Sequence, residues 1–392
     1  MARVDAAPML DQVLAWSAIN TGTGNLDGLA SQWDALARAF STLPGTVSEV
    51  RADKVAAVAA DGTEREVANG AHLVLRVRLE ASRRFLLTGH MDTVFAPGHA
   101  FQHTAWKDAV ILNGPGVADM KGGIAVILAA LTAFEGSDAA AGTGYDVMIN
   151  SDEETGSLSS APLIAELAAG KVAALTYEPS ALPDGTLAGA RAGSGNCSVV
   201  IKGRSAHAGR NPQDGRNALV AAADLAVRLK ALTREGLSIN PARIDGGSAN
   251  NVVPDNAVLR FNIRPRRLDD AAAFDAQFAA LLTEIAKAHE VAVHCHGGLS
   301  RPPKPLDARS EQLFGLVEEC SALLGQPIGR ISSGGVCDGN NIAACGVPVV
   351  DTMGVVGGAI HSPDEFLHVP SLALRAQLSA LVLHRLATGV IL

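Results

Sequence analysis

A histidine and an aspartate, two positions apart, follow an apolar run in the first half of the chain. Leu86-Leu87-Thr88-Gly89 leads into His90, and Asp92 follows after one residue. Side chains at positions i and i+2 of a strand lie on one face. His90 can therefore face a metal ion while Asp92 orients its ring from behind, as a carboxylate commonly does for a ligating histidine. Alone, such a pair is more often an ordinary surface pair.

Further acidic segments and a second histidine favour a metal site over an ordinary surface pair. Asp119 follows Gly116-Val117-Ala118 and precedes a helical apolar pattern, where its simplest role is that of an N-terminal helix carboxylate. Neighbouring carboxylates repel unless cations neutralise them or one takes up a proton. The other segments are Asp152-Glu153-Glu154-Thr155-Gly156-Ser157 after a short apolar strand, Tyr177-Glu178-Pro179 after the next strand, and the glycine-rich loop that contains His361.

Strand ends on one edge of an α/β sheet converge on a crevice, where such folds bind ligands. Mixed imidazole and carboxylate ligands suit zinc, with manganese or cobalt as substitutes. Two histidines and three carboxylates exceed one tetrahedral site but fit two metals, about 3.5–4 Å apart, that share a bridging carboxylate and act in hydrolysis. One glutamate is then left to move protons. The converging residues are His90, Asp119, Glu153, Glu154, Glu178 and His361.

The chain resembles the zinc exopeptidases of the aminoacylase and carboxypeptidase-G type, in particular the glutamate carboxypeptidases. The motifs that carry the resemblance lie at residues 90–94, 116–123, 152–157 and 177–179, and the likeness extends from Ile19 to the His361 loop.

The resemblance implies that Asp119 bridges two Zn²⁺ ions, which Co²⁺ or Mn²⁺ can replace. His90 and Glu178 would complete one metal site, and Glu154 and His361 the other. The same resemblance implies that Glu153 is the general base, that Asp92 supports His90, and that the Asp119–Met120 peptide is cis.

Composition fits a globular protein of two domains. The 392 residues exceed one ordinary core, and 48% hydrophobic with 18% charged residues excludes disorder. The net charge of -8, without a basic stripe, argues against nucleic-acid binding. We expect no membrane span, because no run approaches about 20 apolar residues. The N-terminus lacks the apolar core of a secretory signal, and five scattered cysteines fit reduced thiols, so we expect a cytoplasmic location.

The element order predicts an α/β fold: a doubly wound, mostly parallel sheet in the catalytic domain, with an inserted smaller α/β sandwich. We expect the catalytic domain at residues 1–187 and 300–392 and the insert at 188–299. Glycine-rich stretches at 187–195 and 297–305 are interpreted as linkers. Within the insert the patterns indicate strand 197–202, helix 217–232, strands 239–244 and 257–264, helix 268–289 and strand 291–296.

An open sheet edge in the insert invites pairing with a second copy. In the family that the chain resembles, this domain mediates dimerisation, so a homodimer is expected. Three residues of the insert have roles by resemblance. His207 would reach a neighbouring active site and polarise the scissile carbonyl, Asn251 would contact substrate, and Arg264 would bind the α-carboxylate of the substrate through its planar guanidinium.

A second possible metal motif is His294-Cys295-His296, whose two histidines share a strand face. No further ligand cluster accompanies them in the sequence, which favours ordinary strand sequence.

The expected function is hydrolysis of an amide bond that releases a C-terminal amino acid, glutamate, from N-acyl, peptide or folate-like small molecules with a free carboxylate. Two alternatives remain open. One is an N-acyl-amino-acid deacylase or dipeptidase of the same fold, and the other is a metal-binding protein without catalysis. The presence of Glu153 beside every expected ligand disfavours the latter.

Overall fold

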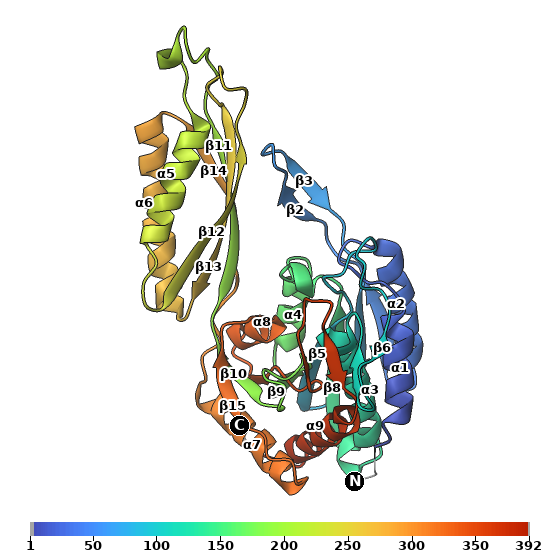
Figure 1. The fold of residues 1–392 in the computed structure, drawn as a ribbon. Helices are drawn as coiled ribbons and strands as arrows, with labels where there is room; N and C mark the ends of the chain where they lie inside the picture. Colours follow the sequence, from blue (N-terminus) through green and yellow to red (C-terminus); the bar gives the residue numbers. More distant parts are fainter. Residues whose placement is uncertain (1–3, 391–392) are drawn as a thin grey trace. The chain divides into compact units, whose positions relative to one another are not determined.

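The computed structural model describes residues 4–390, which form two compact units (Figure 1). Unit 1 contains Met1–Lys54, Ala68–Ala190 and Lys304–Leu392, and unit 2 contains Val55–Val67 and Arg191–Pro303.

The central sheet of unit 1 is mixed. The pairs β8–β5, β5–β9 and β9–β16 are parallel, whereas β1–β4 and β4–β8 are antiparallel. In sheet order the strands are β1 (Thr46–Val50), β4 (His72–Val77), β8 (Thr143–Asn150), β5 (Arg83–His90), β9 (Ala173–Thr176) and β16 (Val349–Val350).

Successive side chains of the buried strands point to opposite faces of this sheet, and helices pack against both faces. On β5, Phe85 and Leu87 belong to one core, and Leu86 belongs to a second core on the opposite face. The doubly wound architecture expected from the sequence is therefore confirmed. The first core receives α1 (Ala7–Ser17), α2 (Leu26–Phe40), α3 (Gly122–Glu135), α7 (Ala308–Leu323) and α9 (Ser371–Ala387), and the second receives α4 (Ala161–Ala168) and α8 (Asp338–Ala344).

One helical segment, Val117–Glu135, is long and apolar enough to cross a membrane by length and composition. It combines η1 (Val117–Lys121) with α3, so Asp119 and Lys121 interrupt its apolar run. The segment is 83% buried inside the structure, as the central helix of a globular core would be. The sequence analysis expected a helix after Asp119 from its apolar pattern, but did not count it as long enough to span a membrane.

Unit 2 is a four-stranded antiparallel sheet with two helices on one face (Figure 1). Val199 and Ile201 of β11 and Phe261 of β13 point into the core below the helices, where Phe261 packs edge-on against Phe274 and Phe278. The expected β-α-β-β-α-β order is present as β11 (Ser194–Lys202), α5 (Ala218–Ala231), β12 (Leu237–Gly246), β13 (Asn256–Pro265), α6 (Leu268–His289) and β14 (Ala292–Arg301).

A hairpin from the first part of the chain also belongs to unit 2. It consists of β2 (Val55–Val58) and β3 (Glu64–Val67), outside the insert range expected from the sequence. The Val58 carbonyl accepts a hydrogen bond from Arg260 Nη2 at 2.8 Å, and the Asp61 carbonyl accepts one from Lys202 Nζ at 3.3 Å. These are contacts between segments far apart in sequence, which local patterns do not reveal.

The glycine-rich stretches interpreted as linkers are largely strand. Residues Leu187–Arg191 form β10, which pairs with β15 (Arg330–Ser333), and β11 begins at Ser194. Strand β14 continues through Gly297 and Gly298, both at positive φ, to Arg301. Ladder pairing with β11 therefore overrides the low strand propensity of glycine here. A further sheet in unit 1 contains β17 (Gly357–Gly358), β18 (Phe366–His368), β7 (Ile111–Asn113) and β6 (Ala105–Trp106).

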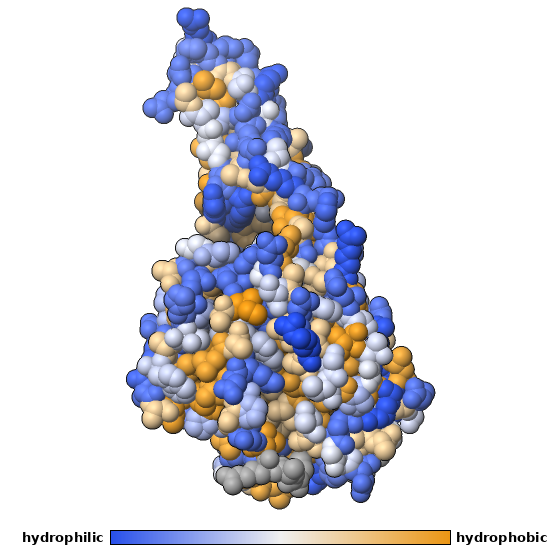
Figure 2. Space-filling view, turned by 90° about the vertical axis from the view of Figure 1, so that its right-hand side faces the viewer, coloured by the Kyte–Doolittle hydropathy of each residue, from blue (hydrophilic) through white to orange (hydrophobic). Residues whose placement is uncertain are grey.

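The surface is mixed in polarity. On the face drawn in Figure 2, apolar residues lie in small groups separated by hydrophilic ones. Exposed apolar side chains scattered in this way are normal for a folded protein. Two of them, Val220 and Val227, lie two helical turns apart on α5 and are 52% and 71% exposed.

Candidate metal centre

The carboxyl ends of three of the parallel strands, β5, β8 and β9, bring their acidic segments to one edge of the central sheet. His90 ends β5 and pairs with Asn150, the last residue of β8, and Thr88 pairs with Thr176, the last residue of β9. Glu153 and Glu154 follow β8, and Glu178 follows β9. The convergence of these residues follows directly from strand direction.

Asp119 reaches the same edge from the N-terminal side of α3. Gly123 allows this approach, because a Cβ atom there would lie 2.1 Å from the Tyr177 carbonyl oxygen. Gly116, at φ 72°, turns the chain into η1. The Asp119–Met120 peptide is cis, as the resemblance implied.

Each oxygen of the buried Asp119 carboxylate faces a different histidine. Asp119 Oδ1 lies 3.1 Å from His90 Nε2, and Oδ2 lies 3.2 Å from His361 Nε2. Glu178 Oε2 is 3.8 Å from His90 Nε2, and Glu154 Oε2 is 3.1 Å from His361 Nε2. The five side chains predicted as metal ligands thus form two groups that share Asp119.

These groups shift one another's protonation strongly. Hydrogen bonds to Asp119 and Glu154 raise the pKa of His361 to about 11. Burial and the Asp119 charge raise the pKa of Glu154 to about 7. Burial opposes the charged form of His90, but Glu178, Asp119 and Asp92 outweigh it and raise the pKa of His90 well above its ordinary value.

Asp92 is fully buried and links the strand end to the Glu153-Glu154 segment. Its backbone carbonyl lies 3.0 Å from His90 Nδ1, and its carboxylate Oδ1 is 3.4 Å from the same nitrogen. The carboxylate also accepts hydrogen bonds from the backbone N–H groups of Glu153 and Glu154 at 3.2 and 3.1 Å, and from the Thr23 hydroxyl at 2.8 Å. Asp92 therefore fixes the backbone of the neighbouring acidic segment as well as facing the His90 ring.

Two further residues, to which the sequence analysis gave no role, hold the Asp119 loop. The buried Glu365 carboxylate accepts hydrogen bonds from the backbone N–H groups of Gly116, Ala118 and Asp119 at 3.0–3.2 Å. Lys121 is 1% exposed and donates to the carbonyls of Trp16 and Ile19. Burial lowers the pKa of Lys121 to about 7. The sequence feature that could have indicated these two residues is the position of a charged side chain beside an apolar or glycine-rich motif.

His207 and Asn251 lie together in unit 2. The Ala208 N–H donates to the Asn251 carbonyl at 2.9 Å, and His207 forms an isolated β-bridge with Val252. His207 Nδ1 accepts hydrogen bonds from the backbone N–H groups of Gly209 and Arg210, which places the proton of a neutral ring on exposed Nε2.

Arg264 lies near the opposite end of β13 from these two residues. Strand β13 starts at Asn256, next to the loop that contains Asn251, and Arg264 is its penultimate residue. Eight residues of extended strand span about 26 Å. The Arg264 Nε donates to Asn262 Oδ1 at 2.9 Å, which orients its guanidinium group. Within one chain, His207 and Arg264 are therefore too far apart to contact the same small molecule.

The structure also gives His294 and His296 a third potential ligand. Their side chains group with Glu64 of the β2–β3 hairpin, and His296 Nε2 lies 3.6 Å from Glu64 Oε1. The sequence analysis did not associate Glu64 with the two histidines because it is more than 200 positions away in the chain, but both histidines do lie in a strand, β14, as expected. Glu64 and His294 are exposed.

Comparisons with known proteins find similarity to a carboxypeptidase and to a desuccinylase. Residues 189–290 match the family model described as a peptidase dimerisation domain. The chain is 29% identical over 380 residues to carboxypeptidase G2 of Pseudomonas sp., covering 95% of this chain and 87% of that protein. It is 27% identical over 320 residues to succinyl-diaminopimelate desuccinylase of Xanthomonas oryzae pv. oryzae, covering 77% and 83%.

The fold is that of a solved M20 family metallo-carboxypeptidase from Sulfolobus solfataricus, with a TM-score of 0.74 at 13% identity over 97% of this chain and 99% of the other. The resemblance predicted from the motifs is confirmed, and the chain is a hydrolytic enzyme.

Replacing Asp92 by Asn should destabilise unit 1. An amide supplies only one carbonyl oxygen, so at least one of the buried N–H groups of Glu153 and Glu154 loses its acceptor. The expected decrease in the free energy of unfolding is about 1–3 kcal/mol. It is measured by urea unfolding with a chelator present, so that changes in metal affinity do not contribute. The exposed Asp34→Asn variant is the matched control, and equal stability of the two variants would contradict the proposed anchoring.

Proposed function

We propose that this chain, a hydrolytic enzyme similar to M20 metallopeptidases over nearly its whole length, is a binuclear zinc-dependent amidohydrolase. It releases a C-terminal amino acid, glutamate, from N-acyl, peptide or folate-like substrates. The observation that carries the proposal is the Asp119 carboxylate, whose two oxygens face histidines of two different ligand groups.

The donor set fits two divalent cations. Asp119 would bridge them, with His90 and Glu178 on one side and Glu154 and His361 on the other. Imidazole nitrogens with carboxylate oxygens suit Zn²⁺, and Co²⁺ or Mn²⁺ are substitutes. Bound cations of this kind acidify a water molecule and polarise the scissile carbonyl.

Glu153 serves as the general base and acid. It is 7% exposed and directly precedes the ligand Glu154, and its backbone N–H is fixed by the Asp92 carboxylate. The Glu153 carboxylate takes a proton from the attacking water and delivers it to the leaving amine. Asp92 keeps both Glu153 and the His90 ring in position.

Arg264 and Asn251 bind the substrate. The Arg264 guanidinium pairs with the free carboxylate of the amino acid to be released, which restricts cleavage to a chain end. The His207 Nε2–H group donates a hydrogen bond to the scissile carbonyl oxygen as negative charge develops on it. The exposed His207 side chain, with Nδ1 occupied as an acceptor, and the hydrogen bond that Arg264 Nε donates to Asn262 Oδ1 support the assignments of His207 and Arg264.

The enzyme acts as a homodimer in which His207 serves the partner's substrate. The separation along β13 supports this arrangement, because one small substrate held by Arg264 is out of reach of His207 from the same chain. The match of residues 189–290 to a peptidase dimerisation domain supports it independently. The exposed Val220 and Val227 on α5 offer apolar contacts for a second copy.

Glutamate as the released amino acid is supported by the similarity to carboxypeptidase G2. The similarity to a desuccinylase favours a second candidate, an N-acyl-amino-acid deacylase or dipeptidase built on the same site. A cytoplasmic location is supported by five cysteines that form no disulfide. The substrate is a small molecule, with neither a nucleic acid nor a membrane as partner.

A panel of N-acyl amino acids and dipeptides, assayed with zinc for release of the free amino acid, tests the proposed function. We expect N-acyl-glutamate to be hydrolysed with the highest kcat/KM. Preference for an N-succinyl group irrespective of the amino acid would favour the deacylase instead, and no hydrolysis of any member would contradict both.

Replacing Glu153 by Gln should remove the base while retaining the shape of the side chain. Turnover should fall about 10²–10⁴-fold, the usual contribution of general acid–base catalysis, and the zinc content should stay unchanged. The matched control is Glu166→Gln, whose side chain is 66% exposed. Near-normal turnover of the Glu153 variant would rule out its role as base.

Mixing two inactive variants tests the contribution of the partner subunit. In hybrids of His207→Ala with Glu153→Ala, one of the two sites combines an intact Glu153 with an intact His207 from the other subunit, so up to half of the wild-type activity should return. Hybrids of His90→Ala with Glu153→Ala should stay inactive, because both residues serve their own chain. Absence of restoration in tag-purified His207→Ala hybrids would show that His207 acts within its own chain.

A further inference from the structure

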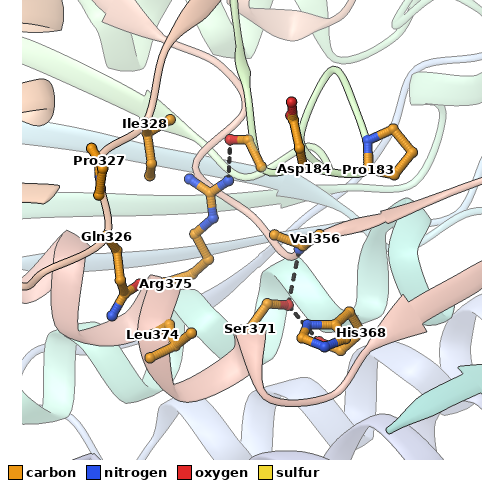
Figure 3. A pocket seen from close by; sticks show the side chains of 11 residues that line it. Pro183, Asp184, Gln326, Pro327, Ile328, Val356, His368, Ser371, Leu374 and Arg375 are labelled. Atoms are coloured by element: carbon orange, nitrogen blue, oxygen red, sulfur yellow. Dashed lines mark hydrogen bonds between the residues drawn. The ribbon is translucent and has the colours of Figure 1, made fainter.

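Unit 1 contains a cavity of about 300 Å³ that none of the residues assigned to hydrolysis lines (Figure 3). Its walls come from three parts of the chain that are distant in sequence: the turn after Ser180, the segment between α7 and β15, and the start of α9 with the strands before it. The lining residues are Pro183, Asp184, Gly185, Gln326, Pro327, Ile328, Val356, His368, Ser371, Leu374 and Arg375.

The Arg375 guanidinium lies in the centre of this group of side chains (Figure 3). The residue is 3% exposed. Its Nη2 donates a hydrogen bond to the Gly185 carbonyl at 2.6 Å, whereas its buried Nη1 has no hydrogen-bond partner within residues 4–390. Arginine is rarely buried without a counter-charge, because removing the cation from water is costly. Burial alone lowers the pKa of Arg375 to about 10, so the group stays charged at neutral pH.

The other polar groups of the cavity do not compensate this charge. Asp184 is exposed, and its carboxylate accepts a hydrogen bond from the backbone N–H of Thr186 at 2.9 Å. The Ser371 hydroxyl donates to the His368 carbonyl and accepts from the Val356 N–H (Figure 3). In the part of the chain that the structure describes, no carboxylate pairs with Arg375. Arg375, one of the residues that line the cavity, therefore carries a buried charge without a carboxylate partner and an Nη1 group without an acceptor among the described residues.

The remaining walls are mainly apolar. Pro327, Ile328, Val356 and Leu374 surround the guanidinium (Figure 3). A cavity of this size is at the lower limit of ligand sites, which usually combine apolar walls with a few polar groups that fix orientation. A bare inorganic anion would leave the apolar walls without contact, whereas an organic acid would use both features.

We propose that this cavity is a binding site for a small carboxylic acid with a short apolar body, whose carboxylate pairs with Arg375. The Nη1 group donates to the carboxylate, and Pro327, Ile328 and Leu374 contact the hydrocarbon part. The site is independent of the hydrolytic centre and of the proposed function.

Butyrate binding to the zinc-loaded protein tests this proposal by calorimetry and thermal unfolding. We expect a binding event that weakens in Arg375→Met, with the dissociation constant raised at least about tenfold, as for loss of a hydrogen bond to a charged group. Arg385→Met, on the same helix but 39% exposed, should bind butyrate as the wild type does. Because carboxylates also bind elsewhere, the difference between the two variants isolates the cavity.

A second variant keeps the test decisive if Arg375→Met does not fold. Leu374→Trp fills the cavity and leaves the charge in place, so it should also lose butyrate binding while the hydrolytic activity remains. Phosphate, used as a comparison ligand, should bind more weakly than butyrate at this site. Unchanged butyrate binding in both variants, or no binding to the wild type, would overturn the proposal. Stronger binding of phosphate than of butyrate would contradict the proposal that the ligand has an apolar part.

Discussion

The crowding of carboxylates at one edge of a buried parallel sheet is the constraint on which the rest of unit 1 depends. Asp119, Glu154 and Glu178 lie within reach of the same two histidines, although like charges at such distances cannot all remain ionised without compensation. The raised pKa values of Glu154 and His361 express this conflict. Two divalent cations would resolve it by replacing protons with fixed positive charge, which is why the arrangement supports a binuclear centre.

Surrounding residues keep this crowded group in place. Glu365 accepts hydrogen bonds from three backbone N–H groups of the Asp119 loop, and Lys121 of the same loop donates to a backbone carbonyl in the last turn of α1. Asp92 does the same for the Glu153-Glu154 segment. Charged side chains thus serve as backbone acceptors and donors behind the ligands. Rigid placement of this kind lets a hydrolytic site act without reorganising.

His90, Asp119, Glu154 and Glu178 could be grouped from the sequence because each follows an apolar strand or precedes an apolar helix, whereas His361 lies in a loop. His90, Glu154 and Glu178 could be placed at one sheet edge from strand direction alone. The β2–β3 hairpin and its Glu64 could not, since only tertiary contacts bring them to His296 in unit 2. The same holds for Glu365, whose partners are nearly 250 positions away. Glycine content at 187–195 was misleading, because cross-strand pairing decides the conformation there.

Unit 2 carries a different constraint, the length of its strands. Asn251 and His207 sit at one end of β13 and Arg264 near the other, so a small substrate cannot contact them all in one chain. In a dimer, His207 of one subunit and Arg264 of the other could contact the same substrate. The match to a peptidase dimerisation domain agrees with this arrangement.

The most direct test of the account is the zinc content of variants of the bridging carboxylate. Elemental analysis should find two ions per chain in the wild type, none in Asp119→Ala and one in His361→Ala, because only Asp119 contributes to both ligand groups. All three are measured in a His296→Ala background, so that an ion held by Glu64 and His294 is not counted. Two ions retained by the Asp119 variant would contradict the central claim.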